Sequence, residues 1–315
     1  MRVLVTALGS MAAPFVVDSL HAMGHEVVGV DIHPRPWIAA AAQVDVFAQV
    51  PTLARADAYQ QALLALCEAQ HVQLVLPLTD PEVDELCTCA GAFASRGIKL
   101  AVPSLEAVRL LRDKLALHDH FSASALPVIP SFRAANYLAL GGTFPCIAKP
   151  ARGRSSEGQF VFRSRVDFER AAPLGESYIV QPFLEGDVVV VDVLRSGPAP
   201  ALIVARRELL RTRNGAGLAV QILDADVTLQ SHVDALCQAI DFEGCINVEF
   251  LQLSNGGLRL MDVNPRFSAG VAFSGLAGYN FVHNHVRHHL GQTPEPLGLI
   301  QGGAIYTRKY TEVIV

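Results

Sequence analysis

Two acidic residues, Glu249 and Asp262, are spaced so that a tight β-hairpin would bring their side chains together. Between them, Asn255-Gly256 separates two runs of alternating apolar and polar residues. This pair favours a two-residue type I′ turn, because both central residues of such a turn need positive φ. With that turn, Leu253 faces Leu258, and the two carboxylates face each other on one side of the sheet. The sequence therefore predicts a pair of opposed acids.

Opposed like charges destabilise a sheet unless something compensates them, and a divalent cation would do so. In the same register Asn247 faces Asn264. Oxygen ligands from Glu249, Asp262 and Asn264 would suit Mg²⁺, or Mn²⁺ in its place, with positions left for water and phosphate oxygens. Arg266 follows with the same parity, where its planar guanidinium would stabilise a phosphoryl group in transfer. The alternative is a solvated hairpin face with ordinary surface acids.

Lys149 ends a short apolar strand, 145–150, and a loop from Gly153 to Gly158 follows it. Backbone N–H groups in such a loop can turn toward phosphate oxygens, while a lysine at the strand end neutralises them. Further on, Gln181 to Gly186 forms a hinge whose apolar centre would pack a flat base at a domain junction. Each feature also has a structural explanation, because glycines close hairpins and prolines occur in linkers.

The pocket for an acceptor substrate is marked less clearly. One candidate is the turn Thr79-Asp80-Pro81-Glu82, in which Asp80 and Glu82 would contact the substrate. Another is an arginine cluster, in which Arg206 and Arg213 would clamp a carboxylate. The same arginines also fit a solvated strand and loop.

The elements that must hold these residues fall into three regions. From 1 to 102, strand-like runs alternate with helical stretches, which predicts a parallel sheet with crossover helices. Ser104 then opens a connecting helix as its N-cap. The stretch 120–183 has the short strands and turns of a small α+β lobe, and 184–315 carries longer strands, a helix and the hairpin.

Composition limits the kinds of partner. The chain has 315 residues and a formal net charge of −5, so it offers no basic field for nucleic acid or an anionic membrane surface. No segment approaches the roughly 18 uninterrupted apolar residues of a membrane span, and the six cysteines form no CxxC pair. Scattered cysteines fit a reducing compartment, which predicts a cytoplasmic protein acting on small molecules. The composition leaves a homodimer as one of the alternatives for the oligomeric state.

The motifs occur in the order seen in ATP-grasp ligases, and the chain resembles the branch that includes the carbamoyl phosphate synthase large subunit and biotin carboxylase. The resemblance spans nearly the whole chain, and Glu249 with Asp262-Val263-Asn264-Pro265-Arg266 is its most specific part. It implies an ATP-grasp fold of α/β and α+β parts. The expected domains are a Rossmann-like pre-ATP-grasp domain (1–103), a connecting helix (104–119), a lid (120–183) and a C-terminal subdomain with the Mg/ATP site (184–315).

By position, the resemblance implies that ATP is held between the two lobes. Arg266 and Lys149 would be catalytic. The family usually has a ribose-binding acid two places after the hinge glycine, but here that place is Val188, so Asp187 or Glu185 would have to substitute. Asp262 stands where glutamate is usual, a shorter side chain that should still bind metal. The residues that would contact ATP are Lys114, Lys149, Ser155, Ser156, Gly158, Gln181, Phe183, Leu184 and Asp187.

The resulting prediction is a ligase that activates a carboxylate as an acyl phosphate and passes it to an amine or related nucleophile, releasing ADP and phosphate. A rival is a catalytically silent ATP sensor of the same fold. Gly9 and Asp31 hint at a dinucleotide site, but a GxGxxG turn needs three glycines, which argues against a dehydrogenase. His285, His288 and His289 share a helix face with helical spacing, which suggests zinc, although a solvated helix face is favoured.

Overall fold

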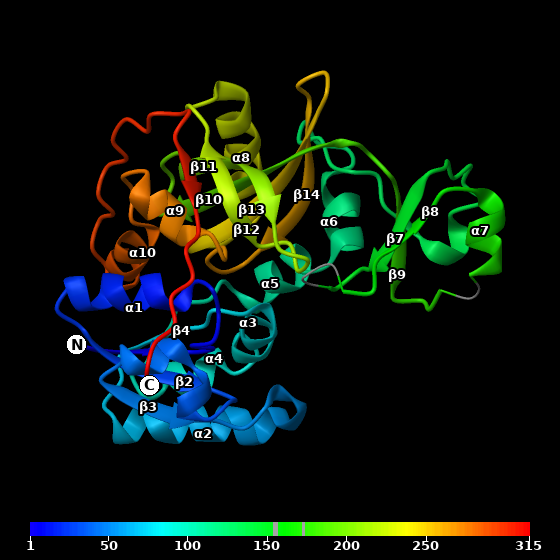
Figure 1. Cartoon of the computed structure of the whole chain (residues 1–315). Helices are drawn as coiled ribbons and strands as arrows, with labels where there is room; N and C mark the ends of the chain where they lie inside the picture. The colour runs from blue at the N-terminus through cyan, green and yellow to red at the C-terminus, as the bar shows by residue number, and fades with distance from the viewer. Residues whose placement is uncertain (154–156, 172–173) are drawn as a thin grey trace.

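The computed structural model describes residues 1–153, 157–171 and 174–315. Within them the chain forms three sheets, one in each of the three regions that the sequence indicated (Figure 1). The expected phosphate contacts Ser155 and Ser156 lie outside the described residues. Among the residues that are described, no helix combines the length and apolar character needed to span a bilayer. The domain boundaries drawn from the sequence are kept as a proposal.

The N-terminal region builds the predicted parallel sheet, with strand order β3-β2-β1-β4-β5. α-Helices connect β1 to β2, β3 to β4 and β4 to β5, as crossovers between parallel strands require, whereas only 3-10 turns lie between β2 and β3. Its elements are β1 (Arg2–Val5), α1 (Ala13–Ala22), β2 (Glu26–Asp31), β3 (Val46–Gln49), α2 (Ala56–Ala69), β4 (Leu74–Leu76), α3 (Asp80–Leu86), α4 (Ala90–Ala94) and β5 (Lys99–Leu100), with 3-10 turns η1 (Arg35–Trp37), η2 (Ala39–Ala42) and η3 (Leu53–Arg55).

The connecting helix is two helices, α5 (Leu105–Leu111) and α6 (Lys114–Phe121). Ser104 caps α5 as predicted, because its side chain accepts a hydrogen bond from the Ala107 N–H. The single helix expected over 104–119 is wrong, since Asp113 has extended backbone angles and starts a new helix as its N-cap. The break places Lys114 at the first position of α6.

The small lobe holds a four-stranded antiparallel sheet of order β6-β9-β7-β8. Tyr137, Cys146 and Phe162 belong to a hydrophobic cluster of its own. In Figure 1 this lobe projects away from the rest of the molecule. Its elements are β6 (Phe132–Arg133), η4 (Ala134–Asn136), β7 (Cys146–Pro150), β8 (Phe160–Phe162), α7 (Arg165–Arg170) and β9 (Tyr178–Pro182).

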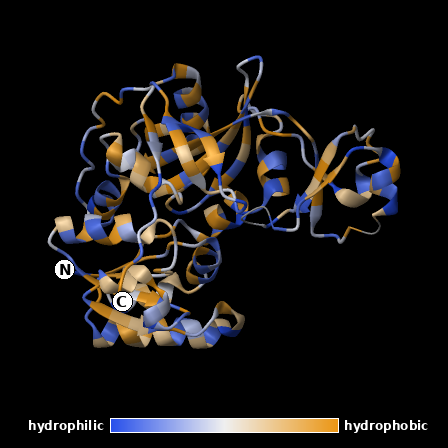
Figure 2. Ribbon diagram, viewed as in Figure 1, coloured by the Kyte–Doolittle hydropathy of each residue, from blue (hydrophilic) through white to orange (hydrophobic). Residues whose placement is uncertain are grey.

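The C-terminal region forms a six-stranded antiparallel sheet of order β14-β13-β10-β11-β12-β15. Helix α8 packs with one face of this sheet in a shared cluster of buried residues. Figure 2 shows apolar residues concentrated along its strands. The elements are β10 (Gly186–Arg195), β11 (Leu202–Arg211), β12 (Gly217–Ile222), α8 (Val227–Ala239), β13 (Gly244–Leu253), β14 (Leu258–Asn264), α9 (Val271–Leu276), α10 (Phe281–His289) and β15 (Ile305–Thr307).

The β13–β14 hairpin confirms the predicted pairing at the acids but not at the turn. Glu249 pairs with Asp262, whereas Leu253 pairs through its N–H with the carbonyl of Gly257 rather than facing Leu258. The turn has a three-residue loop with positive φ at Gly256 but not at Asn255, the pattern of a turn followed by a G1 bulge. A second irregularity, at Met261, shifts the register back by one residue. The two offsets cancel before the acids are reached.

Candidate active site

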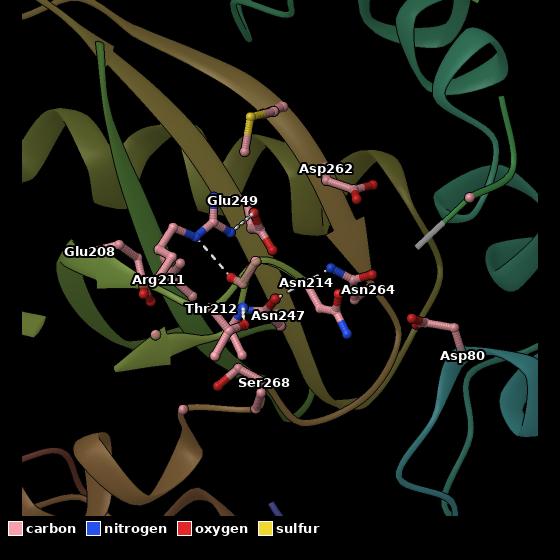
Figure 3. Close-up of a pocket in the computed structure, with 18 of the residues that line it drawn as sticks. Asp80, Glu208, Arg211, Thr212, Asn214, Asn247, Glu249, Asp262, Asn264 and Ser268 are labelled. Atoms are coloured by element: carbon pink, nitrogen blue, oxygen red, sulfur yellow. Dashed lines mark hydrogen bonds and ion pairs between the residues drawn. The ribbon is translucent and has the colours of Figure 1, made fainter. Parts of the chain in front are cut away.

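A cleft of ≈ 550 Å³ is lined by all three regions of the chain. The large sheet contributes Glu249, Asp262 and Asn264, and the small lobe contributes Lys149. Asp80, from the N-terminal region, also lines the cleft, on the side of Asn264 (Figure 3). Residues that the sequence predicted from separate motifs therefore meet in one cavity. A cavity at the junction of domains is a common place for a small-molecule site.

The proposed metal ligands lie on adjacent strands at the cleft. In this structure lysine and arginine neutralise them: Lys114 Nζ is 3.1 Å from Asp262 Oδ1, and Arg211 Nη2 is 3.3 Å from Glu249 Oε2. The Asn264 amide nitrogen donates to Asn247 Oδ1 at 3.3 Å, which leaves the Asn264 amide oxygen to face a cation. Two carboxylates and an amide oxygen fit Mg²⁺ when phosphate oxygens and water complete the shell.

The charged groups at this edge are partly or fully buried. Burial raises the pKa of Glu249, and Asp262 adds to the increase, while the nearby Arg211 lowers it. Burial, and then Lys114, lower the pKa of Lys149 to about 8, against the opposite pull of Asp262 and Glu249. Lys149 is 6% exposed, so little water solvates its ammonium group, and a nearby anion would favour the charged form. A polyphosphate would supply that anion.

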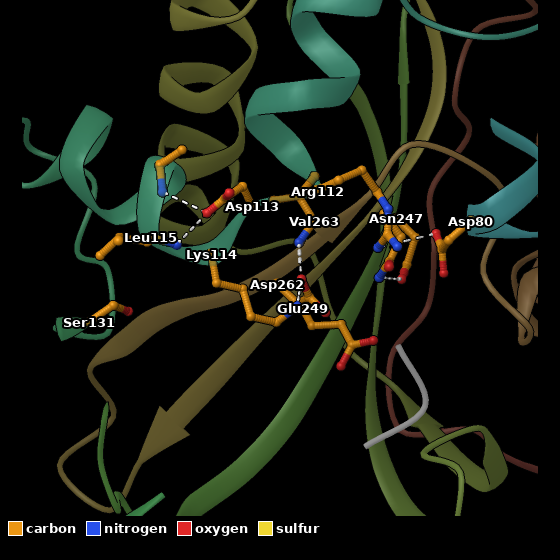
Figure 4. A network of polar contacts seen from close by, with 12 residues as sticks. Asp80, Arg112, Asp113, Lys114, Leu115, Ser131, Asn247, Glu249, Asp262 and Val263 are labelled. Atoms are coloured by element: carbon orange, nitrogen blue, oxygen red, sulfur yellow. Dashed lines mark hydrogen bonds and ion pairs between the residues drawn. The ribbon is translucent and has the colours of Figure 1, made fainter. Parts of the chain in front are cut away.

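Lys114 is held in place by local structure (Figure 4). Asp113 Oδ1 accepts hydrogen bonds from the N–H groups of Leu115 and Ala116, each at 3.1 Å, which fixes the start of α6. The Lys114 N–H donates to the Ala151 carbonyl at 3.0 Å, so the same residue joins the connector to the loop after β7. The side chain then points across the cleft to Asp262.

The hinge lines the cleft as predicted by its place in the sequence. Gln181 is buried, and its amide donates to Ser131 Oγ at 2.7 Å. Phe183 and Leu184 are cleft residues together with Ile147, which gives an apolar wall for a flat base. Gly158 has φ 67°, and a Cβ there would meet the Tyr178 hydroxyl and the ring of Pro150. Gly158 is not among the residues that line the cleft.

Arg266 lies two residues after Asn264, one of the proposed metal ligands, and forms an ion pair with the N-terminal region. It forms a two-bond ion pair with Asp80, with N–O distances of 2.9 and 2.6 Å. Arg112 approaches the same carboxylate at 3.7 Å. Burial of Asp80 would raise its pKa, but Arg266 and Arg112 outweigh burial and hold the pKa below its usual value. Asp80 is therefore an ionised partner of Arg266.

Asp187, expected at the nucleotide, points the wrong way. It pairs across the sheet with Gln252, whereas Val190 pairs with Glu249. Because Asp187 and Val190 are three residues apart on one strand, they face opposite sides of the sheet. Asp187 instead lies 3.2 Å from Arg207. Val188 has the parity of Val190, so the place usual for a ribose acid does face the cleft and holds valine.

Three expected substrate contacts need correction. Glu82 accepts hydrogen bonds from Thr6 and Tyr59 and completes the capping box of α3. Its carboxylate therefore has a structural role and is not available to a substrate. Arg213 is exposed in the β11–β12 turn and is not part of the cleft lining. Arg206 does line the cleft, but it is 1% exposed and pairs with Asp192 at 2.7 Å, which leaves little of its charge for a substrate.

The sequence prediction missed Glu208, which lines the cleft with its side chain 3% exposed. Burial raises its pKa, and Arg206 and Arg211 oppose that change. Alternation along β11 from Arg206 would have indicated it. Ser268, also missed, follows Arg266 by two residues and accepts a hydrogen bond from Arg206 at 2.9 Å.

The two alternative sites find no support in the described residues. Asp31 Oδ2 accepts a hydrogen bond from the Gly9 N–H at 2.8 Å, and its other oxygen accepts from the His33 N–H. The acid that hinted at a dinucleotide site therefore binds backbone groups of its own region. Within the described residues, no group of three or more His, Cys, Asp or Glu is placed to hold a metal ion. His285 is buried and accepts from the Cys245 N–H at 3.0 Å, a structural role.

Comparison with solved structures defines the class of fold. Biotin carboxylase from Campylobacter jejuni superposes with a TM-score of 0.79 at 18% identity, covering 93% of this chain and 72% of that one. N5-carboxyaminoimidazole synthetase from Staphylococcus aureus, complexed with ADP, gives 0.77 at 17% identity, covering 96% and 80%. At such identities the likeness shows the fold, which is the ATP-grasp fold expected from the sequence.

Family models agree with this class. Residues 175–307 match the model described as ATP-grasp in the biosynthetic pathway with Ter operon, and residues 3–101 match the PylC-like N-terminal domain. Over these two stretches the chain carries an ATP-grasp domain and a PylC-like N-terminal domain.

Curated relatives match over part of their length. Formate-dependent phosphoribosylglycinamide formyltransferase from Burkholderia mallei (strain SAVP1) is 28% identical over 177 residues, which are 54% of this chain and 41% of the relative. The protein of the same name from Burkholderia thailandensis is 29% identical over the same length. The chain thus spans well under half the length of these relatives.

Proposed function

We propose that this chain is an ATP-dependent ligase that activates a small carboxylate as an acyl phosphate and transfers the acyl group to an amine or a related nucleophile, releasing ADP and phosphate. The observation that carries the proposal is the pairing of Glu249 with Asp262 inside a cleft that also holds Lys114 and Lys149. Opposed acids beside two lysines match the mixed charge of a magnesium–triphosphate complex.

In this proposal the chain's own residues position the reactants and neutralise charge. Lys114 and Lys149 contact the phosphates, while Phe183 and Leu184 pack the base. Glu249, Asp262 and Asn264 hold Mg²⁺, or Mn²⁺, which when bound neutralises charge on the phosphate oxygens. Arg266 stabilises the phosphoryl group as the substrate carboxylate oxygen attacks the γ phosphorus and the bond to the β–γ bridging oxygen breaks. The nucleophile then attacks the acyl carbon, and phosphate leaves.

A phosphate-release screen with ATP and Mg²⁺ tests the proposal. The panel pairs each of several carboxylates with each of several amines. The carboxylates are amino acids, bicarbonate and formate, and formate is included because the name of a relative contains it. We expect release with at least one pair, and loss of at least about 100-fold in Glu249→Gln and Asp262→Asn. Asp187→Asn, a matched acid on the opposite face, should keep wild-type turnover. Normal turnover in Glu249→Gln would refute the assignment.

The second candidate is a catalytically silent ATP sensor, which the valine at the ribose position favours. Isothermal titration separates the two: tight MgATP binding without ADP formation across the whole panel would favour the sensor. We further propose a cytoplasmic location and small molecules as the substrates, and sedimentation at assay concentration tests whether the chain is a homodimer.

A further inference from the structure

The N-terminal domain contributes the carboxylate of Asp80 to the wall of the cleft. Asp80, the first residue of α3, is 2% exposed and binds Arg266 through both oxygens, to Nε at 2.9 Å and to Nη2 at 2.6 Å. We propose that Asp80 is a positioning residue that fixes the Arg266 guanidinium for contact with the transferred phosphoryl group. This inference rests on the proposed function, because it assigns Asp80 a role in the same site.

A count of donors shows what the pair leaves free. A guanidinium has five N–H donors in one plane. Two bind Asp80, and Nη1 donates a third to the Phe267 carbonyl at 2.9 Å. Two donors then remain, one on each terminal nitrogen, and Arg266 lines the cleft close enough to Glu249 and Asp262 for their charges to act on it. A bidentate pair fixes both the plane and the rotation of the arginine, so Asp80 sets where the remaining donors point.

Local structure holds Asp80 itself in place. Thr79 and Glu82 form the capping box that starts α3, in which the Thr79 N–H donates to Glu82 Oε2 at 3.2 Å. Arg112, two residues before Lys114, lies 3.7 Å from Asp80 and 3.1 Å from Asp84. Arg112 thus lies between the buried Asp80 and the more exposed Asp84. Figure 4 shows Arg112 beside Asp80. Asp84 touches Arg112 but not Arg266 in this structure, which makes it a matched control.

The test measures binding of orthovanadate, a phosphate mimic, to protein saturated with MgADP. In Asp80→Asn we expect vanadate affinity to fall by about tenfold, and turnover of any pair found in the screen to fall by about 100-fold, because a small misplacement of a catalytic group has effects of that size. MgADP affinity should stay within about threefold, since the nucleotide contacts are elsewhere. Asp84→Asn should match wild type in all three.

Further variants separate positioning from folding. Asp80→Glu keeps the charge but displaces the Arg266 guanidinium, so vanadate binding should weaken while the thermal midpoint of unfolding stays near that of wild type. This variant keeps the test valid even if Asp80→Asn does not fold. Arg266→Lys should reproduce the vanadate defect, and the double variant should be no worse than either single one. Wild-type protein that fails to bind MgADP would remove the proposed function and this role together. Normal MgADP binding with unchanged vanadate affinity in Asp80→Glu would overturn the role of Asp80 alone.

Discussion

Lys149 shows how burial prepares a single residue for an anion. Its ordinary pKa is 10.5, and burial with the nearby Lys114 lowers the pKa to about 8. In the protein without ligand, the charged form is therefore disfavoured, and stability should rise as the pH increases from about 8 toward 10.5, where the unfolded chain binds the extra proton. Phosphate oxygens reverse the balance, because they favour the charged form.

Binding of MgATP should therefore take up a proton above pH 8. We expect calorimetry in buffers of different ionisation enthalpy to show uptake near pH 8.5, and MgATP affinity to fall as the pH rises from about 8. Lys149→Arg stays charged in this range and should bind without that uptake. Equal uptake in wild type and Lys149→Arg would show that another group titrates.

At the scale of an element, the N-cap of helix α6 also positions a residue of the proposed ATP site. Asp113 starts the helix by accepting from the N–H groups of Leu115 and Ala116, and the next residue, Lys114, reaches Asp262. The other Asp113 oxygen lies 3.3 Å from Arg152, but the Arg152 side chain is 62% exposed. An ion pair that exposed contributes little, so the cap is the larger contribution of Asp113.

Removing the cap should weaken both the helix and the site. Asp113→Ala is expected to lower the free energy of unfolding by about 1 kcal/mol, and to weaken MgATP binding several-fold because the frayed turn carries Lys114. Asp113→Asn keeps a cap and loses the charge, so both quantities should stay close to wild type. Denaturant titration and calorimetry measure the two effects, and a binding defect in Asp113→Asn as large as in Asp113→Ala would point to the charge instead.

Across the whole molecule, the first and last regions share a core. Val16 and Leu20 of α1 belong to the same hydrophobic cluster as Phe281 and Val286 of α10. A hydrogen bond of 3.0 Å between Asn280 and Ser19 joins the same surfaces. The small lobe, in contrast, packs its own cluster. The N-terminal domain and the C-terminal sheet are therefore expected to unfold as one unit.

Phe281→Ala tests this shared core. The ring is 0% exposed, and its loss should lower the free energy of unfolding by about 3 to 5 kcal/mol. Trp37 is the one tryptophan of the chain and lies in the N-terminal domain, so its fluorescence should report the same shift as far-ultraviolet circular dichroism. Phe162→Ala, in the separate cluster of the small lobe, should leave the Trp37 midpoint close to wild type. A Trp37 transition unmoved by Phe281→Ala would contradict the shared core.

Local sequence determined the parts of the site that depend on strand parity and turn residues. The opposition of Glu249 and Asp262 followed from alternation along two strands joined by a short turn, although the turn type was wrong and a bulge at Met261 restored the register. The parallel N-terminal sheet and the capping by Ser104 also followed from local pattern. A cap depends on neighbours within a few residues, which a sequence displays directly, whereas the bulge that restored the hairpin register was not predicted.

Tertiary structure decided which polar groups remain available to a ligand. Asp80 and Arg266 are 186 residues apart in the chain and yet form the closest ion pair at the cleft wall, and Glu82 beside Asp80 is spent on a helix cap. Asp187 was lost from the site because parity on β10 turns it to the other face of the sheet. Such pairs depend on how separate elements pack. Packing is driven by the burial of apolar surface, which is non-directional, so the sequence does not show which polar groups will meet. The sequence thus shows which residue types could take part in the chemistry, while the tertiary structure decides which of them pair with one another.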